Sequence, residues 1–174
     1  MQAPFLLPDA GPLITLAYAG QLDLLLRPGW PLRLVDMVLH EVTRNATPTR
    51  DAITVFMAQH QPPVIETVTC RRHQERMTLG GEQGPKVRKA GLGELAMQEA
   101  INQLAWLEPP QPAVLLFEDH KIARTGFHLP EGTLRVSTRA FLIFLEEKGW
   151  LASAAEVEHQ AIQAGRRFSA LRFP

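Results

Sequence analysis

Residues 113–124 read AVLLFEDHKIAR, and this stretch decides how the rest of the chain is interpreted. Four apolar residues at 114–117 are followed directly by two acids, Glu118 and Asp119. A short apolar run bounded by polar residues is typical of a strand buried on both faces. Ligands of open α/β sheets bind beyond the carboxyl ends of such strands. Glu118 and Asp119 therefore mark a candidate functional site.

The start of the chain repeats this arrangement. Residues 5–8 are apolar and lead into Asp9, which is followed by AGPLI. Because neighbouring parallel strands end at the same edge of a sheet, we expect Asp9 to share one crevice with Glu118 and Asp119. Pro8 directly precedes Asp9, and since proline lacks a backbone donor, we expect the strand to be distorted there.

Composition limits the classes of protein to consider. With 174 residues, 45% of them hydrophobic, the chain suits one globular domain spanning 1–174. Lys+Arg and Asp+Glu number 18 each, so net charge neither favours nor excludes a polyanionic partner. The single cysteine, Cys70, excludes an intramolecular disulfide and a cysteine-based zinc cluster. Neither a membrane span nor a signal peptide is expected, so we predict a cytoplasmic protein.

Strands alternate with helices along the sequence. Strands are predicted at residues 4–8, 32–35, 64–69, 114–117 and 134–136. Helices are predicted at 13–26 with a break at Gly20, at 37–42 after a cap at Asp36, at 52–60 after a cap at Asp51, and at 91–107, 121–125, 138–148 and 153–164. This alternation predicts a three-layer α/β/α fold with a mainly parallel central sheet and a C-terminal helical extension at about 152–174.

A basic segment at about 70–91 interrupts the pattern and is predicted to be a loop insertion. It contains several glycines and six Lys/Arg residues against two Glu residues. Two interpretations stay open, a solvated loop or a loop that contacts phosphates. Arg88 and Lys89 in this segment, together with Arg124 beyond the central strand, are the candidate RNA contacts.

Five acids stand at predicted strand ends or near helix starts: Asp9, Glu41, Glu94, Glu118 and Asp119. Singly, each has an ordinary explanation as a helix cap, a partner of a helix dipole or a solvated side chain. Together they are expected at one sheet edge, because right-handed crossovers bring strand ends and the following helix starts to the same side. Carboxylates about 5 Å apart repel by roughly 1–4 kcal/mol per pair, and a divalent cation removes that cost. Oxygen ligands suit Mg²⁺ or Mn²⁺, which activate water for attack on phosphodiesters.

Four segments in this order, DAGPLI (9–14), LHEVT (39–43), GLGELAMQEA (91–100) and VLLFEDHKIAR (114–124), resemble the PIN-domain family. The resemblance covers about residues 5–151 and is strongest to the VapC-like ribonuclease toxins. It implies a PIN-like fold and a Mg²⁺- or Mn²⁺-dependent endoribonuclease. It also implies a homodimer, and a toxin that is neutralised by a small antitoxin protein.

The resemblance assigns roles to individual acids. Asp9 matches the family's first Asp, Glu41 its helix Glu, Glu94 its third acid and Asp119 its fourth. Many relatives have Asp-Asp where this chain has Glu118-Asp119, so either residue is a candidate metal ligand, with Asp119 preferred. The alternative function is a catalytically silent PIN-like module that binds nucleic acid or a protein partner.

Overall fold

The computed structural model describes residues 3–78, 91–107, 109–118 and 129–167. The strands are β1 (Phe5–Pro8), β2 (Leu34–Val35), β3 (Val64–Ile65), β4 (Ala113–Phe117) and β5 (Thr133–Ser137). The helices are α1 (Ala10–Tyr18), the 3-10 helix η1 (Leu22–Leu26), α2 (Asp36–Thr43), α3 (Pro48–His60), α4 (Val68–Thr78), α5 (Leu92–Ala105), α7 (Thr138–Glu147) and α8 (Ala154–Gln163). No helix in these described ranges is both long and apolar enough to cross a membrane.

The strand pairs in the described part of the chain are all parallel. β4 lies between β1 and β5, and β2 pairs with β3. A parallel bridge between Leu6 and Leu32 connects β1 to the chain just before β2, and the Leu6 N–H donates to the Pro31 carbonyl at 3.0 Å. All five residues of β4 are buried, so helices cover this strand on both faces. The predicted three-layer α/β fold with a mainly parallel sheet is confirmed.

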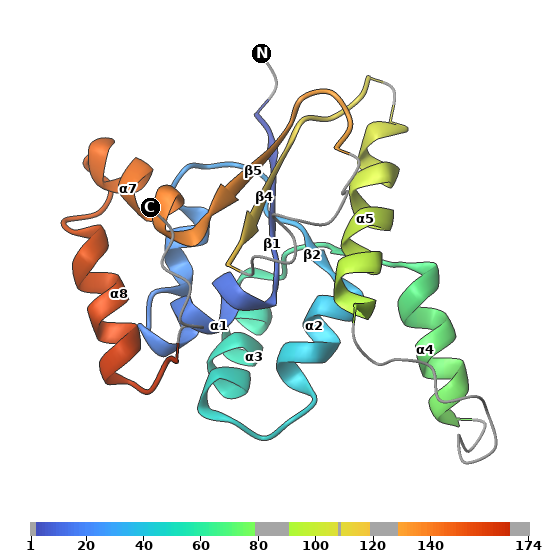
Figure 1. The fold of residues 1–174 in the computed structure, drawn as a ribbon, viewed down its shortest axis with the longest axis horizontal. Helices are drawn as coiled ribbons and strands as arrows, with labels where there is room; N and C mark the ends of the chain where they lie inside the picture. The colour runs from blue at the N-terminus through green and yellow to red at the C-terminus, as the bar shows by residue number, and fades with distance from the viewer. Residues whose placement is uncertain (1–2, 79–90, 108, 119–128, 168–174) are drawn as a thin grey trace.

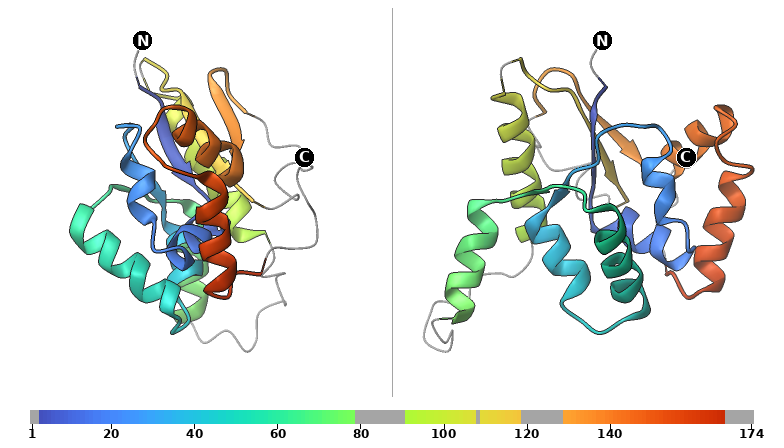
Figure 2. Two further views of the ribbon diagram at one scale, coloured as in Figure 1. Left: turned by 90° about the vertical axis from the view of Figure 1, so that its left-hand side faces the viewer. Right: turned by 180° about the vertical axis from the view of Figure 1, so that it is seen from behind.

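The arrangement of the elements places the ends of the strands. In Figure 1 the arrows of β4 and β5 point toward the end of the molecule at which α1 and α2 lie. α5 lies on one flank of the strands, and α7 and α8 lie on the other, which the view from behind in Figure 2 confirms. The carboxyl ends of the strands therefore face the beginnings of the helices that follow them. A site at the carboxyl edge of a parallel sheet requires this arrangement.

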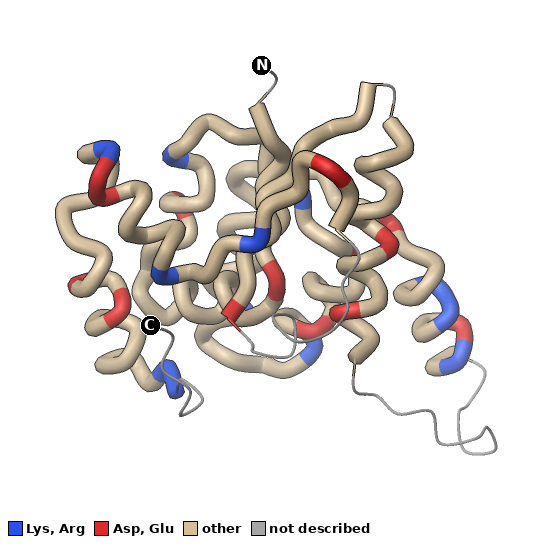
Figure 3. The backbone as a smooth tube through the Cα atoms, turned by 45° about the horizontal axis from the view of Figure 1, so that its top comes forward, with Lys and Arg blue, Asp and Glu red and all other residues tan. Residues whose placement is uncertain are grey.

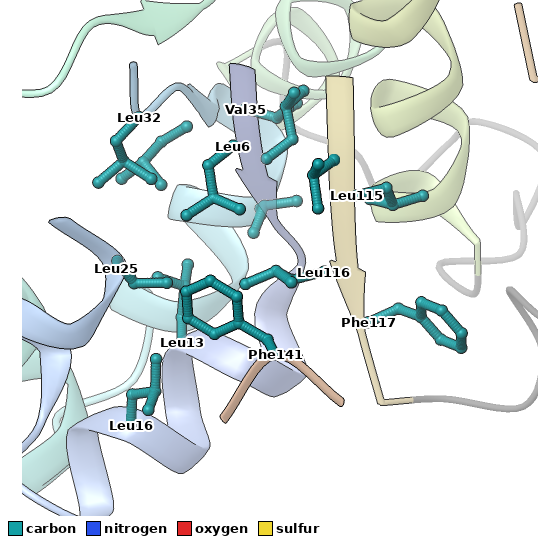
Figure 4. Packing of buried hydrophobic residues seen from close by; sticks show 14 of the residues in the cluster. Leu6, Leu13, Leu16, Leu25, Leu32, Val35, Leu115, Leu116, Phe117 and Phe141 are labelled. Atoms are coloured by element: carbon teal, nitrogen blue, oxygen red, sulfur yellow. The ribbon is translucent and has the colours of Figure 1, made fainter. Parts of the chain in front are cut away.

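The core holds the strand ends in place. Leu6, Leu115 and Leu116 are fully buried in the sheet, and Leu13 from α1 and Phe141 from α7 pack on the same cluster (Figure 4). Each such side chain contributes roughly 1.5–3 kcal/mol when buried. The edge that carries Asp9 and Glu118 is thus anchored on two neighbouring, well-packed strands.

Pro8 does not distort β1, which corrects the expectation from the sequence. The register continues through Pro8, which pairs with Leu116. Phe5 and Asp9 donate their N–H groups toward the β4 side, whereas Leu6 donates to the opposite side. Backbone N–H groups alternate sides along a strand, so an N–H at position 8 would point toward the β2 side, as that of Leu6 does. The pairing on that side is the bridge between Leu6 and Leu32, which Pro8 lies beyond. Proline is tolerated because no ladder bond is lost.

Two predicted helix caps are wrong. α3 begins one turn earlier than expected, because the Thr47 hydroxyl accepts the Arg50 N–H at 3.1 Å, and Asp51 lies inside the first turn. Asp36 is the first residue of α2, and the cap position is occupied by Val35. The break at Gly20 is confirmed, since this residue has φ 65° between α1 and η1.

The predicted strand at 64–69 and the predicted loop at 70–91 are also corrected. The strand is limited to Val64–Ile65, and α4 already begins at Val68. Glu99 of α5 stabilises this start by accepting bonds from the Thr69 N–H at 3.3 Å and the Thr69 hydroxyl at 2.6 Å. The helix contributes few apolar side chains to the core, so its sequence lacks the periodicity that would have revealed it.

The basic residues of this segment are therefore partly helical. Arg71, Arg72 and Arg76 lie on exposed positions of α4. This helix lies at the outer edge of the molecule in Figure 1 and carries both blue and red segments in Figure 3. Residues 79–90, with Arg88 and Lys89, lie outside the described residues, as does the helix predicted at 121–125.

Candidate active site

The first two predicted site segments meet at one sheet edge, as expected from the sequence. β1 and β4 are parallel neighbours, and the Asp9 N–H donates to the Leu116 carbonyl at 2.9 Å. A Cβ atom added at Gly11 would lie 2.9 Å from the Cβ of Glu118, closer than side-chain packing permits. Gly11, two residues after Asp9, therefore lets the start of α1 approach the end of β4.

Asp9 is placed by the backbone and does not act as a conventional helix cap. It occupies the N-cap position of α1 in an extended conformation, but its side chain makes no capping hydrogen bond. The ordinary explanation offered by the sequence, that Asp9 caps the following helix, is therefore wrong. Its carboxylate follows β1 directly, at the edge where the PIN-like reading expects an acid.

Glu118 is held in a buried polar triad that the sequence did not predict. Its Oε2 atom accepts from the Thr15 hydroxyl at 2.9 Å and from Arg166 at 2.8 Å, and the Arg166 Nε donates to the Thr15 hydroxyl at 2.8 Å. The side chains of Glu118 and Arg166 are only 13% and 19% exposed. Glu118 is thus not a solvated acid, since its charge is paired inside the protein.

Arg166 is the functional-site residue that sequence reasoning missed. It follows Gly165, whose φ of 108° redirects the chain after α8 toward α1. No periodicity or motif points to it, because its partners lie 151 and 48 residues away in the sequence. Only the packing of α8 against α1 brings it to the strand edge.

The second oxygen of Glu118 has a different environment. Oε1 is buried and has no hydrogen-bond partner in the described part of the chain. A buried carboxylate oxygen that lacks a donor is costly, so it needs a water, a cation or a neighbouring donor group. This oxygen is compatible with the divalent cation that the sequence predicts.

Glu41 and Glu94 form a second group of acids between α2 and α5. A Cβ atom at Gly93 would lie 2.9 Å from Oε2 of Glu41, so the carboxylate lies directly against the first turn of α5. Glu94 is the next residue and lies in the same first turn. The expectation that Glu41 merely faces water is wrong, because its side chain is half-buried here.

Electrostatics at Glu41 reflect this confinement. Burial raises the pKa of Glu41 above its ordinary value, and the nearby charge of Glu94 acts in the same direction. Arg44 is the main opposing influence on this pKa, and a hydrogen bond from the Gly93 backbone helps it, but the net direction stays upward. A carboxylate in this setting gains from any cation bound beside it.

The predicted acids are thus only partly brought together by the part of the chain that is described. Asp9 and Glu118 share the β1–β4 edge, and Glu41 and Glu94 share the α2–α5 contact. No group of three His, Cys, Asp or Glu residues that could hold a metal ion is formed within the described ranges. Asp119, the preferred fourth acid, lies outside them, and so do Arg124, Arg88 and Lys89. The donor set consists of carboxylates, which fits Mg²⁺ or Mn²⁺ in chemical type.

The parallel sheet and its covering helices define an α/β fold. Among solved structures, the chain is similar to the PIN domain of RRP44 from T. brucei, with a TM-score of 0.51 and 14% sequence identity. The similarity covers 84% of this chain and 82% of that chain. No family model and no curated protein matches the sequence. The PIN-like fold is therefore shown by structure alone, and the closer likeness to VapC-like toxins stays a prediction.

Proposed function

We propose that this chain is a metal-dependent endoribonuclease that hydrolyses RNA phosphodiester bonds with Mg²⁺ or Mn²⁺. The observation that carries this proposal is the confinement of Glu41 against Gly93 and Glu94, on a PIN-like fold whose β1–β4 edge presents Asp9. Like charges of this kind are destabilising without a counter-ion, and carboxylate clusters are the usual way to hold a catalytic divalent cation.

The proposed roles follow from the family resemblance and, for Asp9, Glu41 and Glu94, also from their positions in the fold. Asp9, Glu94 and Asp119 would hold the cation, which when bound would supply a Lewis acid that lowers the pKa of water and offsets phosphate charge. Glu41 would accept a proton from the water that attacks phosphorus, as the ribose oxygen leaves. Asp119 is preferred to Glu118 as the fourth acid, because Oε2 of Glu118 is already bonded to Arg166 and Thr15.

The biological setting is proposed from the sequence resemblance. We propose that the chain is a toxin, that a small antitoxin protein neutralises it, and that it acts as a cytoplasmic homodimer. Arg124, Arg88 and Lys89 are proposed to contact RNA phosphates, since basic side chains neutralise the backbone of nucleic acids.

One observation favours the alternative of a catalytically silent PIN-like module. Arg166 already pairs with Glu118, the acid immediately before Asp119, as expected of a site in which Glu118 serves only structure. Such a module would bind nucleic acid or a protein partner without cleaving RNA.

Cleavage of single-stranded RNA by the purified protein separates the two functions. We expect cleavage with Mg²⁺ or Mn²⁺, none with EDTA, and none in Asp9→Asn. Asp23→Asn is the matched control, because Asp23 is exposed on η1 and pairs with His60. Cleavage that survives in Asp9→Asn would assign the activity to a contaminant, and its absence from the metal-loaded wild type would favour the silent module.

A further inference from the structure

A cavity adjoins the candidate active site and is not explained by the acids. It has a volume of about 390 Å³ and lies between α1, α2, the start of α3 and the chain that follows α8. Glu41 lines it, so the cavity and the candidate site share one residue. Its volume falls within the roughly 300–1,000 Å³ that is usual for ligand pockets.

The cavity offers one cationic side chain that is not neutralised by a described neighbour. Arg166 and Arg167 both line it, but Arg166 is paired with Glu118. Arg167 is exposed and forms no ion pair within the described ranges. An anionic group entering the cavity therefore has Arg167 as its natural partner.

The remaining lining combines an aromatic ring, an amide and an apolar surface. Tyr18 supplies the ring, and Ile14 and Val42 supply the apolar surface. Asn45 is exposed, and its amide makes no hydrogen bond within the described ranges. Thr47 is less available, because its hydroxyl caps α3 and bonds to that of Thr49.

We propose that this cavity binds one unpaired nucleotide of a single-stranded RNA, next to the bond that is cleaved. An aromatic ring for stacking, an amide for the base edge and a cation for the phosphate are what single-stranded RNA recognition uses. An acidic peptide would pair with Arg167, but it has no flat, polar group that matches the Tyr18 ring and the Asn45 amide. The position of this nucleotide beside the cleaved bond rests on the proposed nuclease function.

Binding of RNA in EDTA tests the pocket without any cleavage. Fluorescence anisotropy with labelled homopolymeric RNA octanucleotides gives affinity as a function of salt. Arg167→Gln should flatten the plot of log affinity against log salt by about 0.7, the value of one phosphate contact on a single strand. Arg50→Gln is the matched control, because Arg50 is also exposed and belongs to α3 but does not line the cavity. The control should keep the wild-type slope.

Two further variants separate stacking from base recognition. Tyr18→Leu should weaken binding of all four homopolymers by at least about fivefold, the low end for loss of one stacked base. Asn45→Ala should reduce the ratio between the strongest and the weakest affinity among the four homopolymers by at least about fivefold. This is the low end of the discrimination supplied by one base-edge contact. Both Asn45 and Arg167 are exposed, so their variants are expected to keep the wild-type melting temperature.

The outcomes distinguish this inference from the proposed function. If RNA is bound with these effects but never cleaved with Mn²⁺, the nuclease proposal fails and the nucleotide pocket stands. If RNA is cleaved while Arg167→Gln and Asn45→Ala bind it like the wild type, the pocket proposal is overturned and the nuclease stands. Equal slopes in Arg167→Gln and Arg50→Gln, or a wild type that binds none of the octanucleotides, also overturn the pocket.

Discussion

The guanidinium group of Arg166 lies 2.8 Å from the carboxylate of Glu118, although 48 residues separate them in the sequence. Thr15 completes the contact by accepting from Arg166 and donating to Glu118. Three separate parts of the chain, α1, the end of β4 and the segment after α8, are thereby fixed to one another beside Asp9. The geometry of the acidic edge depends on this contact as well as on the strand ladder.

Replacement of Arg166 by Leu should destabilise the protein by about 3 kcal/mol, because it leaves the buried charge of Glu118 without its partner. Urea unfolding followed by circular dichroism measures this free energy. Arg139→Leu is the control, since Arg139 is exposed and forms only a long 3.9 Å pair with the partly exposed Glu158, with side-chain exposures of 58% and 27%. That control should change stability by less than about 1 kcal/mol.

A double variant tests whether the loss arises from the buried charge. Adding Glu118→Gln to Arg166→Leu should recover part of the lost stability, because an amide is less costly to bury than an unpaired carboxylate. A double variant as unstable as the sum of the two single variants would show that packing, not charge pairing, is the function of Arg166.

Divalent cations should raise the melting temperature of the wild type. Mn²⁺ at about 100 times its dissociation constant adds about 2.7 kcal/mol of stability by mass action. Asp9→Asn, Glu94→Gln and Asp119→Asn should each reduce this rise, whereas Glu118→Gln should keep it. A rise in Asp119→Asn as large as in the wild type would show that Asp119 is not a ligand.

The pKa of Glu41 predicts how stability depends on pH in metal-free protein. The folded state holds this proton more tightly than the unfolded chain, since burial raises the pKa of Glu41 above 4.5. Its stabilising effect is complete below that ordinary value and is lost as pH rises through the raised value. The stability of the wild type relative to Glu41→Gln should therefore fall with rising pH in this window. Parallel curves for the two proteins would contradict the prediction.

Substitution of Gly93 by Ala tests the contact between α5 and Glu41. The new methyl group would meet Oε2 of Glu41 at 2.9 Å, so the carboxylate must shift. Because this atom is the end of a flexible side chain, the cost should fall below the roughly 1–3 kcal/mol of overpacking in a rigid core. In a Glu41→Ala background the same substitution should be neutral or stabilising by up to about 1 kcal/mol, because alanine is the better helix former. If Gly93→Ala still destabilises the protein in the Glu41→Ala background, the new methyl group clashes with an atom other than those of Glu41.

Arg88 and Lys89 are tested through the salt dependence of RNA binding. Changing both to Ala should flatten the plot of log affinity against log salt by roughly one unit or more, if each neutralises a phosphate. Arg124→Ala tests the competing candidate separately. Unchanged slopes in both proteins would place the RNA elsewhere on the molecule.

The two strands that carry Asp9 and Glu118 were predictable because buried strands leave a strong local signal. β4 is apolar at every position and ends at two acids, and this pattern alone locates the central strand. The meeting of Asp9 with the end of β4 followed from parallel pairing. By contrast, α4 was missed, because it is exposed along most of its length and contributes little more than Thr69 and Cys70 to the interior.

The positions of the candidate acids were predictable only where these residues are next to a strand or helix start, and their roles stay predictions. Asp9, Glu94 and Glu118 follow that rule, and their positions agree with the sequence. Arg166 could not be found in this way, since its role arises from the packing of α8 on α1 and from the turn at Gly165. The ion pair of an acid such as Glu118 is thus a property of the assembled tertiary structure, not of the local pattern.

The contact between Glu118 and Arg166 also sets an order of events during synthesis. A ribosome makes the chain from the amino terminus, so β1, α1 and β4 are available before the segment after α8 exists. The Glu118 carboxylate is therefore synthesised 48 residues before its guanidinium partner. The contact that ties α1 to the segment after α8 therefore forms only after Arg166 has been synthesised.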